Sequence, residues 1–366
     1  DNMKKRIIIS CFSMLGVLVI IVLSYVIYIS CQYYRIEDNK IYTDEIDNNK
    51  QETVVVGKEY SITTYNIGFG AYNHDFSFFM DQGKMLNGKT VKGKQSKAAS
   101  KDIVLTNTRG AIKEITNLNP DFAFFQEVDT NSTRSFRVNQ FKMLQESLTK
   151  MASVHISNFH SAYLFYPILD PHGLVNSGIA TFSKYKIDKV IRKSLEITDA
   201  FPSKFFDLDR CFSASYLKTN HDNYLVIVNV HLSAYDEGGI YRKKQLQQLN
   251  SFLETEYQKG NYVVCGGDFN HDIANSMNLF ETKQEKPEWV YVLNNDDLNE
   301  NFNFATNNNI PTCRSTDIPY EKNVNYTVVL DGFIVSKNID VRMIENIDTN
   351  FEYSDHNPVY MKFVLK

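Results

Sequence analysis

Cysteine is scarce in this chain, and its scarcity excludes a fold held together by disulfide bonds. Only 5 cysteines occur among 366 residues. Cys11 and Cys31 lie in or beside an apolar N-terminal stretch, which leaves Cys211, Cys265 and Cys313 in the rest of the chain. These three can form at most one internal bridge, so a packed core must stabilise the fold.

An excess of positive charge is also missing. Lys and Arg number 39 against 43 Asp and Glu, which gives a formal net charge of −4. This balance argues against a general nucleic-acid binder. The local exception is a lysine-rich loop made up of Lys84, Lys89, Lys92, Lys94, Lys97 and Lys101. A solvated surface loop is the simpler interpretation, and contact with backbone phosphates is the alternative.

Three common catalytic signatures are absent as well. The sequence has no Gly-x-Ser-x-Gly elbow, no Gly-x-Gly-x-x-Gly after a strand, and no zinc-finger or His-Glu-x-x-His spacing. Serine or cysteine nucleophiles, dinucleotides and zinc are therefore disfavoured. Cys265 lies in an apolar run, where a buried and inert thiol is expected. For His271 and Asp272 a structural loop is expected rather than a metal site.

Residues 264–272 are the most informative stretch that is present. They read Val-Cys-Gly-Gly-Asp-Phe-Asn-His-Asp and continue an apolar run. Residues i and i+2 of an extended segment point to the same side, so Asp268 and Asn270 should lie together at the end of a buried strand. A carboxylate beside an amide suits the activation of a water molecule next to a phosphate. The structural alternative is a turn, because Gly-Gly-Asp is also good turn chemistry.

Polar residues lie at the edges of five further strand-like runs. They are Asn66, Glu127, His231, Asp331 and the pair Asp355 and His356. Any one of them alone is more often a solvated edge than a catalytic group. The whole set predicts several strand ends that converge on one pocket.

The ordered set resembles the endonuclease/exonuclease/phosphatase superfamily, the group with deoxyribonuclease I, abasic-site endonucleases, neutral sphingomyelinases and inositol phosphatases. The matching pieces are Thr64-Tyr65-Asn66, Phe125-Gln126-Glu127-Val128, Asn229-Val230-His231-Leu232, Gly267-Asp268-Phe269-Asn270, Leu330-Asp331-Gly332-Phe333 and Ser354-Asp355-His356. The resemblance implies an α/β fold, a four-layer sandwich of two mainly antiparallel sheets with helices outside. The sequence predicts helices at 106–119, 137–150 and 240–257.

The resemblance also implies a divalent metal ion, Mg²⁺ with Mn²⁺ or Ca²⁺ as alternatives. Glu127 is the expected main ligand, Asn66 a neutral oxygen partner, and Asp355 a residue that completes or supports the ligand shell. Hard cations prefer oxygen ligands, and Mg²⁺ keeps several water molecules, so this small set is sufficient.

The catalytic roles follow from the same match. Asp268 is expected to be the base or orienter of the attacking water, and Asn270 to hold that water or a phosphate oxygen. His356 is expected to contact the phosphate, with Asp331 fixing its tautomer and favouring its charged form. His231 is a candidate general acid or phosphate donor.

The N-terminal segment predicts a membrane anchor. Residues 1–6 carry Lys4, Lys5 and Arg6 and form a short cytoplasmic end, and residues 7–30 are long and apolar enough to span a bilayer. A cleaved signal peptide is the alternative, but its apolar core is usually shorter. Residues 31–57 are polar and acidic, and we expect a solvated linker. Residues 58–366 then form the catalytic domain outside the cytoplasm.

The sequence thus predicts a membrane-anchored, metal-dependent phosphoester hydrolase, first of all a nuclease that cleaves phosphodiester bonds with activated water. A lipid phosphodiesterase of the sphingomyelinase kind or a phosphatase is the alternative. A catalytically inactive binding protein on the same scaffold is the alternative of another class. The expected partners are nucleic acid or another phosphodiester substrate and the membrane, and no protein partner is implied.

Overall fold

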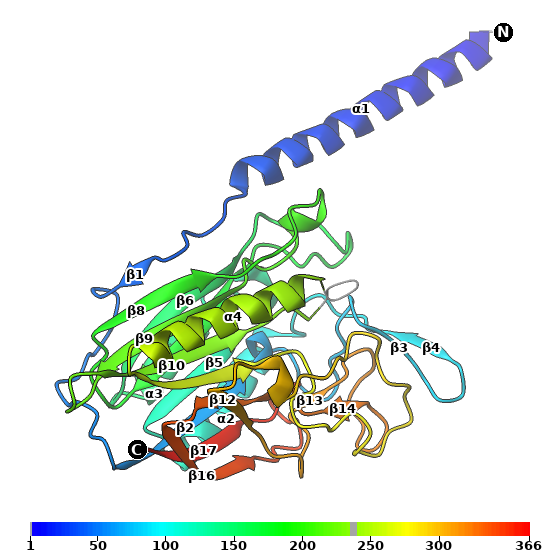
Figure 1. Ribbon diagram of the computed structural model, residues 1–366. Coiled ribbons are helices and arrows are strands. Elements are labelled where there is room, and N and C mark those ends of the chain that lie inside the picture. Colours follow the sequence, from blue (N-terminus) through cyan, green and yellow to red (C-terminus); the bar gives the residue numbers. More distant parts are fainter. Residues whose placement is uncertain (1, 235–239) are drawn as a thin grey trace.

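Two β-sheets pack face to face at the centre of the molecule (Figure 1). The computed structural model describes residues 2–234 and 240–366, so residue 1 of the expected cytoplasmic end lies outside the described part. The seven-stranded sheet has the order β1-β8-β9-β10-β11-β15-β12, and the six-stranded sheet has the order β16-β17-β2-β5-β7-β6. Neighbouring strands are antiparallel except β10 with β11 and β2 with β5.

The elements have the following bounds. The larger sheet contains β1 (Ile41–Tyr42), β8 (Lys189–Ser194), β9 (Cys211–Lys218), β10 (Tyr224–His231), β11 (Tyr262–Asp268), β15 (Asp331–Ser336) and β12 (Phe302–Ala305). The other contains β16 (Ile339–Asn346), β17 (Val359–Leu365), β2 (Glu59–Asn66), β5 (Phe122–Asp129), β7 (Asn176–Ser183) and β6 (Ala152–His160). Two small sheets pair β3 (Gln82–Lys84) with β4 (Thr90–Lys92) and β13 (Cys313–Arg314) with β14 (Thr327–Val328). The helices are α1 (Asn2–Gln32), α2 (Lys101–Leu118), α3 (Gln140–Ser147) and α4 (Ile240–Gln258), with 3-10 turns at Gly68–Gly70, Thr133–Ser135, Ser203–Phe205 and Asn295–Asp297.

Successive side chains of the central strands point to opposite faces of the sheet and so pack into different layers of the interior. In β10, Ile227 packs into the core between the two sheets, whereas Val226 and Val228 pack on the other face. That other face is covered by α4, through Leu249 and Leu253 among others. The outer face of the six-stranded sheet is covered by α2 and α3 in the same way. The expected four-layer sandwich is therefore confirmed.

The three helices expected in the domain are present as α2, α3 and α4. Capping residues and backbone conformation explain where α2 and α3 differ from the expected bounds. Helix α2 begins earlier than expected because the Ser100 side chain accepts a hydrogen bond from the Ile103 amide, and it ends where Asn119 turns left-handed. Helix α3 is shorter than the expected 137–150. Phe136 and Arg137 both have positive φ, which a helix cannot include, and Asn139 caps the first turn instead.

The expected linker at residues 31–57 needs a correction, because much of it packs on the domain. Residues Ile41 and Tyr42 form β1 and pair with β8, and Asp47 pairs with Ser153. The side chains of Ile46 and Val54 are 8% and 0% exposed and belong to the core between the sheets. The few apolar residues of this segment are widely spaced among charged ones. The composition therefore predicts a solvated linker although the segment packs on the domain.

The N-terminal helix α1 projects away from the sheets (Figure 1). Residues 3–32 are long and apolar enough to cross a membrane, with a mean hydropathy of 2.8 over the most apolar window, and that window is not buried in the molecule. By length and composition alone, this helix fits the expected anchor.

Gly267 allows β10 and β11 to approach at the end of the central strands. Its φ is +151°, and a Cβ atom there would lie 1.9 Å from the carbonyl oxygen of Val230. We predict that Gly267→Ala lowers the free energy of unfolding by more than about 2 kcal/mol, measured by chemical denaturation. Gly57→Ala is the matched control, because Gly57 also has a positive φ but has open space around it. Equal losses in the two variants would show that the close approach is not what requires glycine.

Candidate active site

Three neighbouring strands of the larger sheet deliver polar side chains to one place. In the parallel pair β10 and β11, His231 lies opposite Asp268. In the antiparallel pair β11 and β15, Asp268 lies opposite Asp331, the first residue of its strand. The carboxyl ends of parallel strands share one edge of a sheet, and β15 starts at that same edge. Strand register alone therefore places these three side chains next to one another.

The six-stranded sheet contributes Asn66 and Glu127 from the parallel strands β2 and β5. Asn66 lies opposite Gln126, and the pairing of β5 with β7 is interrupted by a bulge between Phe125 and Val128. Glu127 sits in that bulge with a φ of +54°, a conformation that is costly for a residue with a side chain. A bulge re-aims the side chain it carries, and here Glu127 lines the cavity described below.

Asn66 joins the two sheets at this point. Its amide nitrogen donates to Oε1 of Glu127 at 3.1 Å and to Oδ2 of Asp268 at 3.0 Å. Its amide oxygen accepts a hydrogen bond from the Gly68 backbone at 3.0 Å. The oxygen accepts this one hydrogen bond and keeps a second lone pair, so the role of Asn66 as an oxygen ligand of a metal stays a prediction. As arranged, Asn66 positions two carboxylates.

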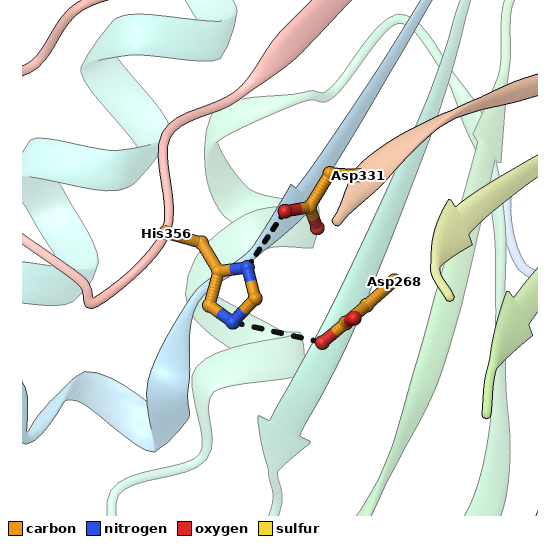
Figure 2. A group of neighbouring side chains, drawn as sticks. All are labelled: Asp268, Asp331 and His356. Atoms are coloured by element: carbon orange, nitrogen blue, oxygen red, sulfur yellow. Dashed lines mark hydrogen bonds and ion pairs between the residues drawn. The ribbon is translucent and has the colours of Figure 1, made fainter. Parts of the chain in front are cut away.

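His356 lies between two carboxylates (Figure 2). Its Nδ1 is 2.8 Å from Oδ2 of Asp331, and its Nε2 is 3.6 Å from Oδ2 of Asp268. Burial alone would lower the pKa of His356, but the negative charges of Asp331, Asp268 and Asp355 raise it well above its ordinary value. The surrounding carboxylates thus favour the charged form of the ring. The other oxygen of Asp331, Oδ1, has no hydrogen-bond partner within the described chain.

His231 completes the group on the other side of Asp268. Its Nε2 is 3.5 Å from Oδ2 of Asp268 and 4.0 Å from Oε1 of Glu127. Burial lowers the pKa of His231 well below its ordinary value, and the positive charge of Arg210 acts in the same direction. The pKa values of the two histidines thus shift in opposite directions: His356 has a carboxylate at hydrogen-bond distance from its Nδ1, whereas Nδ1 of the buried His231 has no hydrogen-bond partner within the described residues.

The carboxylates of the site are held close together and partly out of water. Burial raises the pKa of Glu127 to about 7, and the neighbouring charge of Asp355 adds to the shift. Burial raises the pKa of Asp268 to about 6, while the His356 charge opposes that rise. Burial also raises the pKa of Asp355. Such shifts show that the fold gathers negative charge here at a cost in free energy, which is typical of functional sites.

Asn270 fixes the carboxylate of Asp268. Its backbone N–H donates to Oδ1 of Asp268 at 2.8 Å, and its side-chain nitrogen donates to the Leu232 carbonyl at 2.8 Å. The φ of Asn270 is +50°, so the turn after β11 is strained. Asp272 accepts backbone N–H groups of Ser276 and Met277, in agreement with the expected structural loop.

All these groups meet at one cavity of about 920 Å³. Six of the eight expected site residues line it directly: Glu127, His231, Asp268, Asn270, Asp355 and His356. Asn66 and Asp331 lie behind this lining and contact Asp268 and His356. The structure therefore brings the whole expected set together.

Three buried arginines, Arg134, Arg210 and Arg314, line the cavity, and none of them was among the expected site residues. Arg134 forms a double hydrogen bond with Asp129 at 3.0 and 2.9 Å, and its guanidinium lies 3.8 Å from the centre of the Phe69 ring. Arg314 lies beside Asp355 and donates to the carbonyl of Tyr72. No strand-edge pattern marks Arg314, and the charge of Arg134 is balanced by a carboxylate five residues earlier.

Two residues of the lysine-rich loop form ion pairs with acidic side chains. Lys84 pairs with Glu285 at 2.9 Å, and Lys97 pairs with Asp170 at 2.7 Å. Part of the β3–β4 hairpin is thus charge-balanced by acidic neighbours.

The donor chemistry of the site fits a hard divalent cation. Asp268, Asp331 and His356 come within 4.8 Å of one another and form one candidate cluster. Both ring nitrogens of His356 face carboxylates, however, and a nitrogen that donates a hydrogen bond cannot also bind a metal. Glu127 and Asp355 line the cavity as well, and carboxylate oxygens are the ligands that a hard cation prefers.

Comparison with known proteins identifies the class. A model of the Endonuclease/Exonuclease/phosphatase family matches residues 63–317, and the chain belongs to this family. The resemblance seen in the sequence is thereby confirmed, and the fold is that of a phosphoesterase. No curated protein matches the chain.

Solved structures show the same fold at low sequence identity. An endonuclease/exonuclease/phosphatase from Beutenbergia cavernae DSM 12333 is 14% identical with a TM-score of 0.54, over 84% of this chain and 72% of that one. ANGEL2, a 2',3'-cyclic phosphatase in complex with adenosine-2',3'-vanadate, is 13% identical with a TM-score of 0.53, over 90% and 99%. TDP2 of D. rerio, complexed with a single-strand DNA product, is 11% identical with a TM-score of 0.51, over 84% and 99%.

Proposed function

We propose that this chain is a metal-dependent phosphodiester hydrolase that uses a water molecule as its nucleophile. The observation that carries the proposal is the convergence of carboxylates and two histidines from both sheets on one cavity. A phosphodiester is stable because its negative oxygens repel a nucleophile. Hydrolysis therefore needs positive charge at the phosphate, a base for the water and a proton for the leaving oxygen.

Each need has a matching group. His356, kept charged by Asp331, binds a phosphate oxygen. Asp268, oriented by the Asn270 backbone, accepts the proton of the attacking water. His231 is neutral and donates an N–H to the phosphate or to the leaving oxygen. Glu127 and Asp355 would hold a Mg²⁺ ion, which supplies further positive charge at the phosphate.

Nucleic acid is the substrate class that the sequence predicts. Two of the structural neighbours carry ligands of this kind, a single-strand DNA product and an adenosine vanadate. With this substrate class the chain would be a nuclease, held at the cell membrane by α1 with its domain outside the cytoplasm.

A lipid phosphodiester is the second candidate, and the lining of the cavity favours it. On one side the wall is apolar and aromatic, formed by Leu164, Tyr166 and Phe206 among others. Of the three arginines that line the cavity, Arg134 is paired with Asp129, and Arg210 and Arg314 donate to the backbone carbonyls of Leu232 and Tyr72. A nucleic-acid groove would instead offer basic groups along the path of the backbone.

The experiment is hydrolysis by the full chain in detergent, with Mg²⁺ or with a chelator. Soluble bis(p-nitrophenyl) phosphate, plasmid DNA, RNA, sphingomyelin and inositol phosphates serve as substrates. We expect hydrolysis of at least one phosphoester that stops with the chelator and returns with Mg²⁺. No hydrolysis of any of them would favour the inactive scaffold, and hydrolysis that persists in the chelator would remove the metal from the mechanism.

Glu127→Gln tests the proposed metal ligand separately. The amide keeps the size of the side chain but loses the charge, so the Mg²⁺ concentration for half-maximal activity is expected to rise by about 10-fold or more. Glu146→Gln, an exposed carboxylate on α3, is the control and should leave that concentration unchanged. An unchanged metal requirement in Glu127→Gln would show that the ion binds elsewhere.

A further inference from the structure

Two loops beside the cavity expose apolar side chains to an unusual degree. We call residues 163–170 and 199–206 the rim loops. In the first, Phe165, Ile168 and Leu169 are 55%, 83% and 99% exposed, and in the second Phe201 is 63% exposed. Single exposed apolar residues are common, but a group of them next to a functional cavity marks an interaction surface.

The apolar tip of the first rim loop is held in place from below. Leu164 and Gly173 pair across the base of the loop, and Asp170 forms an ion pair with Lys97 at 2.7 Å. The base of the loop is therefore anchored to the domain, and Ile168 and Leu169 are exposed at its tip.

The end of α1 lies against the same loop. The hydroxyl of Tyr25 donates to the Tyr163 carbonyl at 3.2 Å, and the Tyr163 amide donates to the hydroxyl of Tyr28 at 3.0 Å. The rings of Tyr25 and Phe165 pack edge to face with centroids 5.5 Å apart. Ile29, near the end of the apolar stretch, is only 4% exposed. Tyrosines are typical of the level where a helix leaves a bilayer.

These contacts fix the depth of the rim loop relative to the apolar helix. From Tyr25 to Ile29 the helix rises roughly 6 Å, at 1.5 Å per residue. A loop that contacts Tyr25 therefore lies inside the level at which the apolar stretch ends. That depth is within the roughly 5–10 Å at which apolar groups of interfacial segments sit in a membrane.

The segment after α1 fixes the orientation of the domain. The ring of Tyr33 packs edge to face on Phe205 of the second rim loop at 5.4 Å. Arg35 then forms an ion pair with Asp209 at 2.7 Å. A free linker would let the domain turn in any direction, whereas these contacts keep both rim loops on the side of α1, as Figure 1 shows for the green loops below that helix.

The inner sides of the rim loops form part of the catalytic cavity. Leu164 and Tyr166 of the first loop and Phe206 of the second line the cavity that also contains Glu127 and His231. The surface that faces the end of α1 and the wall of the cavity are thus formed by the same two loops, through different residues.

We propose that the rim loops rest in the surface of the bilayer that α1 spans, and that the site takes the phosphodiester of a membrane lipid from that surface. The inference rests on the proposed hydrolase function and names its substrate class. One water molecule is consumed, one P–O ester bond breaks, and a phosphate monoester and an alcohol are formed. The apolar part of the lipid lies along the rim loops while the phosphate reaches the buried carboxylates and histidines.

Depth-dependent fluorescence quenching tests the surface. The full chain is reconstituted in vesicles of brominated phosphatidylcholine, with Leu169→Trp as the probe and Met343→Trp as the control on β16, which lies at the edge of the molecule away from α1 (Figure 1). Trp289, the only natural tryptophan, stays in place and gives the baseline. We expect quenching of the added emission at position 169 and none at 343. No quenching at 169, or equal quenching at both, would overturn the membrane contact.

Turnover in the same membrane tests the substrate class. Vesicles contain phosphatidylcholine, phosphatidylglycerol and sphingomyelin, and phosphorus NMR follows the headgroups, with bis(p-nitrophenyl) phosphate and plasmid DNA in parallel. In the double variant Ile168→Glu with Leu169→Glu, lipid hydrolysis is expected to fall at least about 10-fold, because two apolar contacts with the bilayer become charged. Neither residue lines the cavity, so hydrolysis of the soluble ester should not change.

The outcomes separate this inference from the hydrolase proposal. Hydrolysis of the soluble ester or of DNA without hydrolysis of any lipid would overturn the lipid inference and leave the hydrolase standing. Lipid hydrolysis that is unchanged in the double variant would overturn the role of the rim loops. No hydrolysis of any phosphodiester would overturn both.

Discussion

Asp268→Asn is expected to lower the turnover of every phosphodiester substrate by about 10²–10⁴-fold. The amide has nearly the same shape and can keep the hydrogen bond from the Asn270 backbone. It cannot accept a proton from water, and it removes the negative charge that faces Nε2 of both His231 and His356. The loss should therefore appear in the catalytic constant, measured on purified full chain at saturating Mg²⁺.

Asp272→Asn is the matched control for this variant. Asp272 lies four residues further along the same segment, is fully buried, and accepts hydrogen bonds from Ser276 and Met277. Its replacement should lower thermal stability while the turnover per folded molecule remains within about 3-fold of the parent. If the two variants lose turnover equally, Asp268 acts only through the stability of the turn after β11.

His356→Ala is expected to cost about 10²–10³-fold in turnover, and Asp331→Asn a smaller but clear loss. Asp331 reaches the substrate only through His356, because its Oδ2 lies 2.8 Å from Nδ1 of the ring. The two losses should therefore not add. In the His356→Ala background, Asp331→Asn should change turnover by less than about 2-fold.

A double-mutant cycle measures this coupling directly. Additive losses would show that Asp331 contributes to the site by a route other than the histidine, such as binding the metal ion itself with His356 and Asp268 as co-ligands. Thermal unfolding of all four proteins in the cycle separates a loss of folding from a loss of chemistry.

The sequence predicts which side chains lie together because polar residues at strand ends carry that information. A polar residue directly after an apolar run, as at Asp268 and His231, must emerge at an edge of a sheet, and the parallel pairing of β10 and β11 puts both at one edge. The order of the motifs then predicts the family, and with it the second sheet that supplies Asn66 and Glu127. The bulge at Glu127 has no such signal, because it depends on how β5 pairs with β7.

The sequence predicts less about residues whose packing or orientation depends on contacts with residues far away in the chain. The segment 31–57 looks solvated because its charges are local, whereas its few apolar residues, such as Val54, bury against strands more than a hundred residues away. The orientation of Asn66 is set by the Gly68 backbone and by a carboxylate 202 residues later. The rim loops have no periodic pattern of apolar residues in the sequence. Their exposed side chains indicate an interaction surface only once the position of α1 is known.

The position of the metal ion is the most direct test of the proposed site. Crystals of the full chain grown with Mn²⁺ would show the ion by its anomalous scattering. We predict a single strong peak in the cavity, bound by oxygens of Glu127 and Asp355 and absent from Glu127→Gln crystals. A peak coordinated by the ring of His356, or no peak in the cavity at saturating Mn²⁺, would contradict the proposed arrangement of metal, base and phosphate-binding histidine.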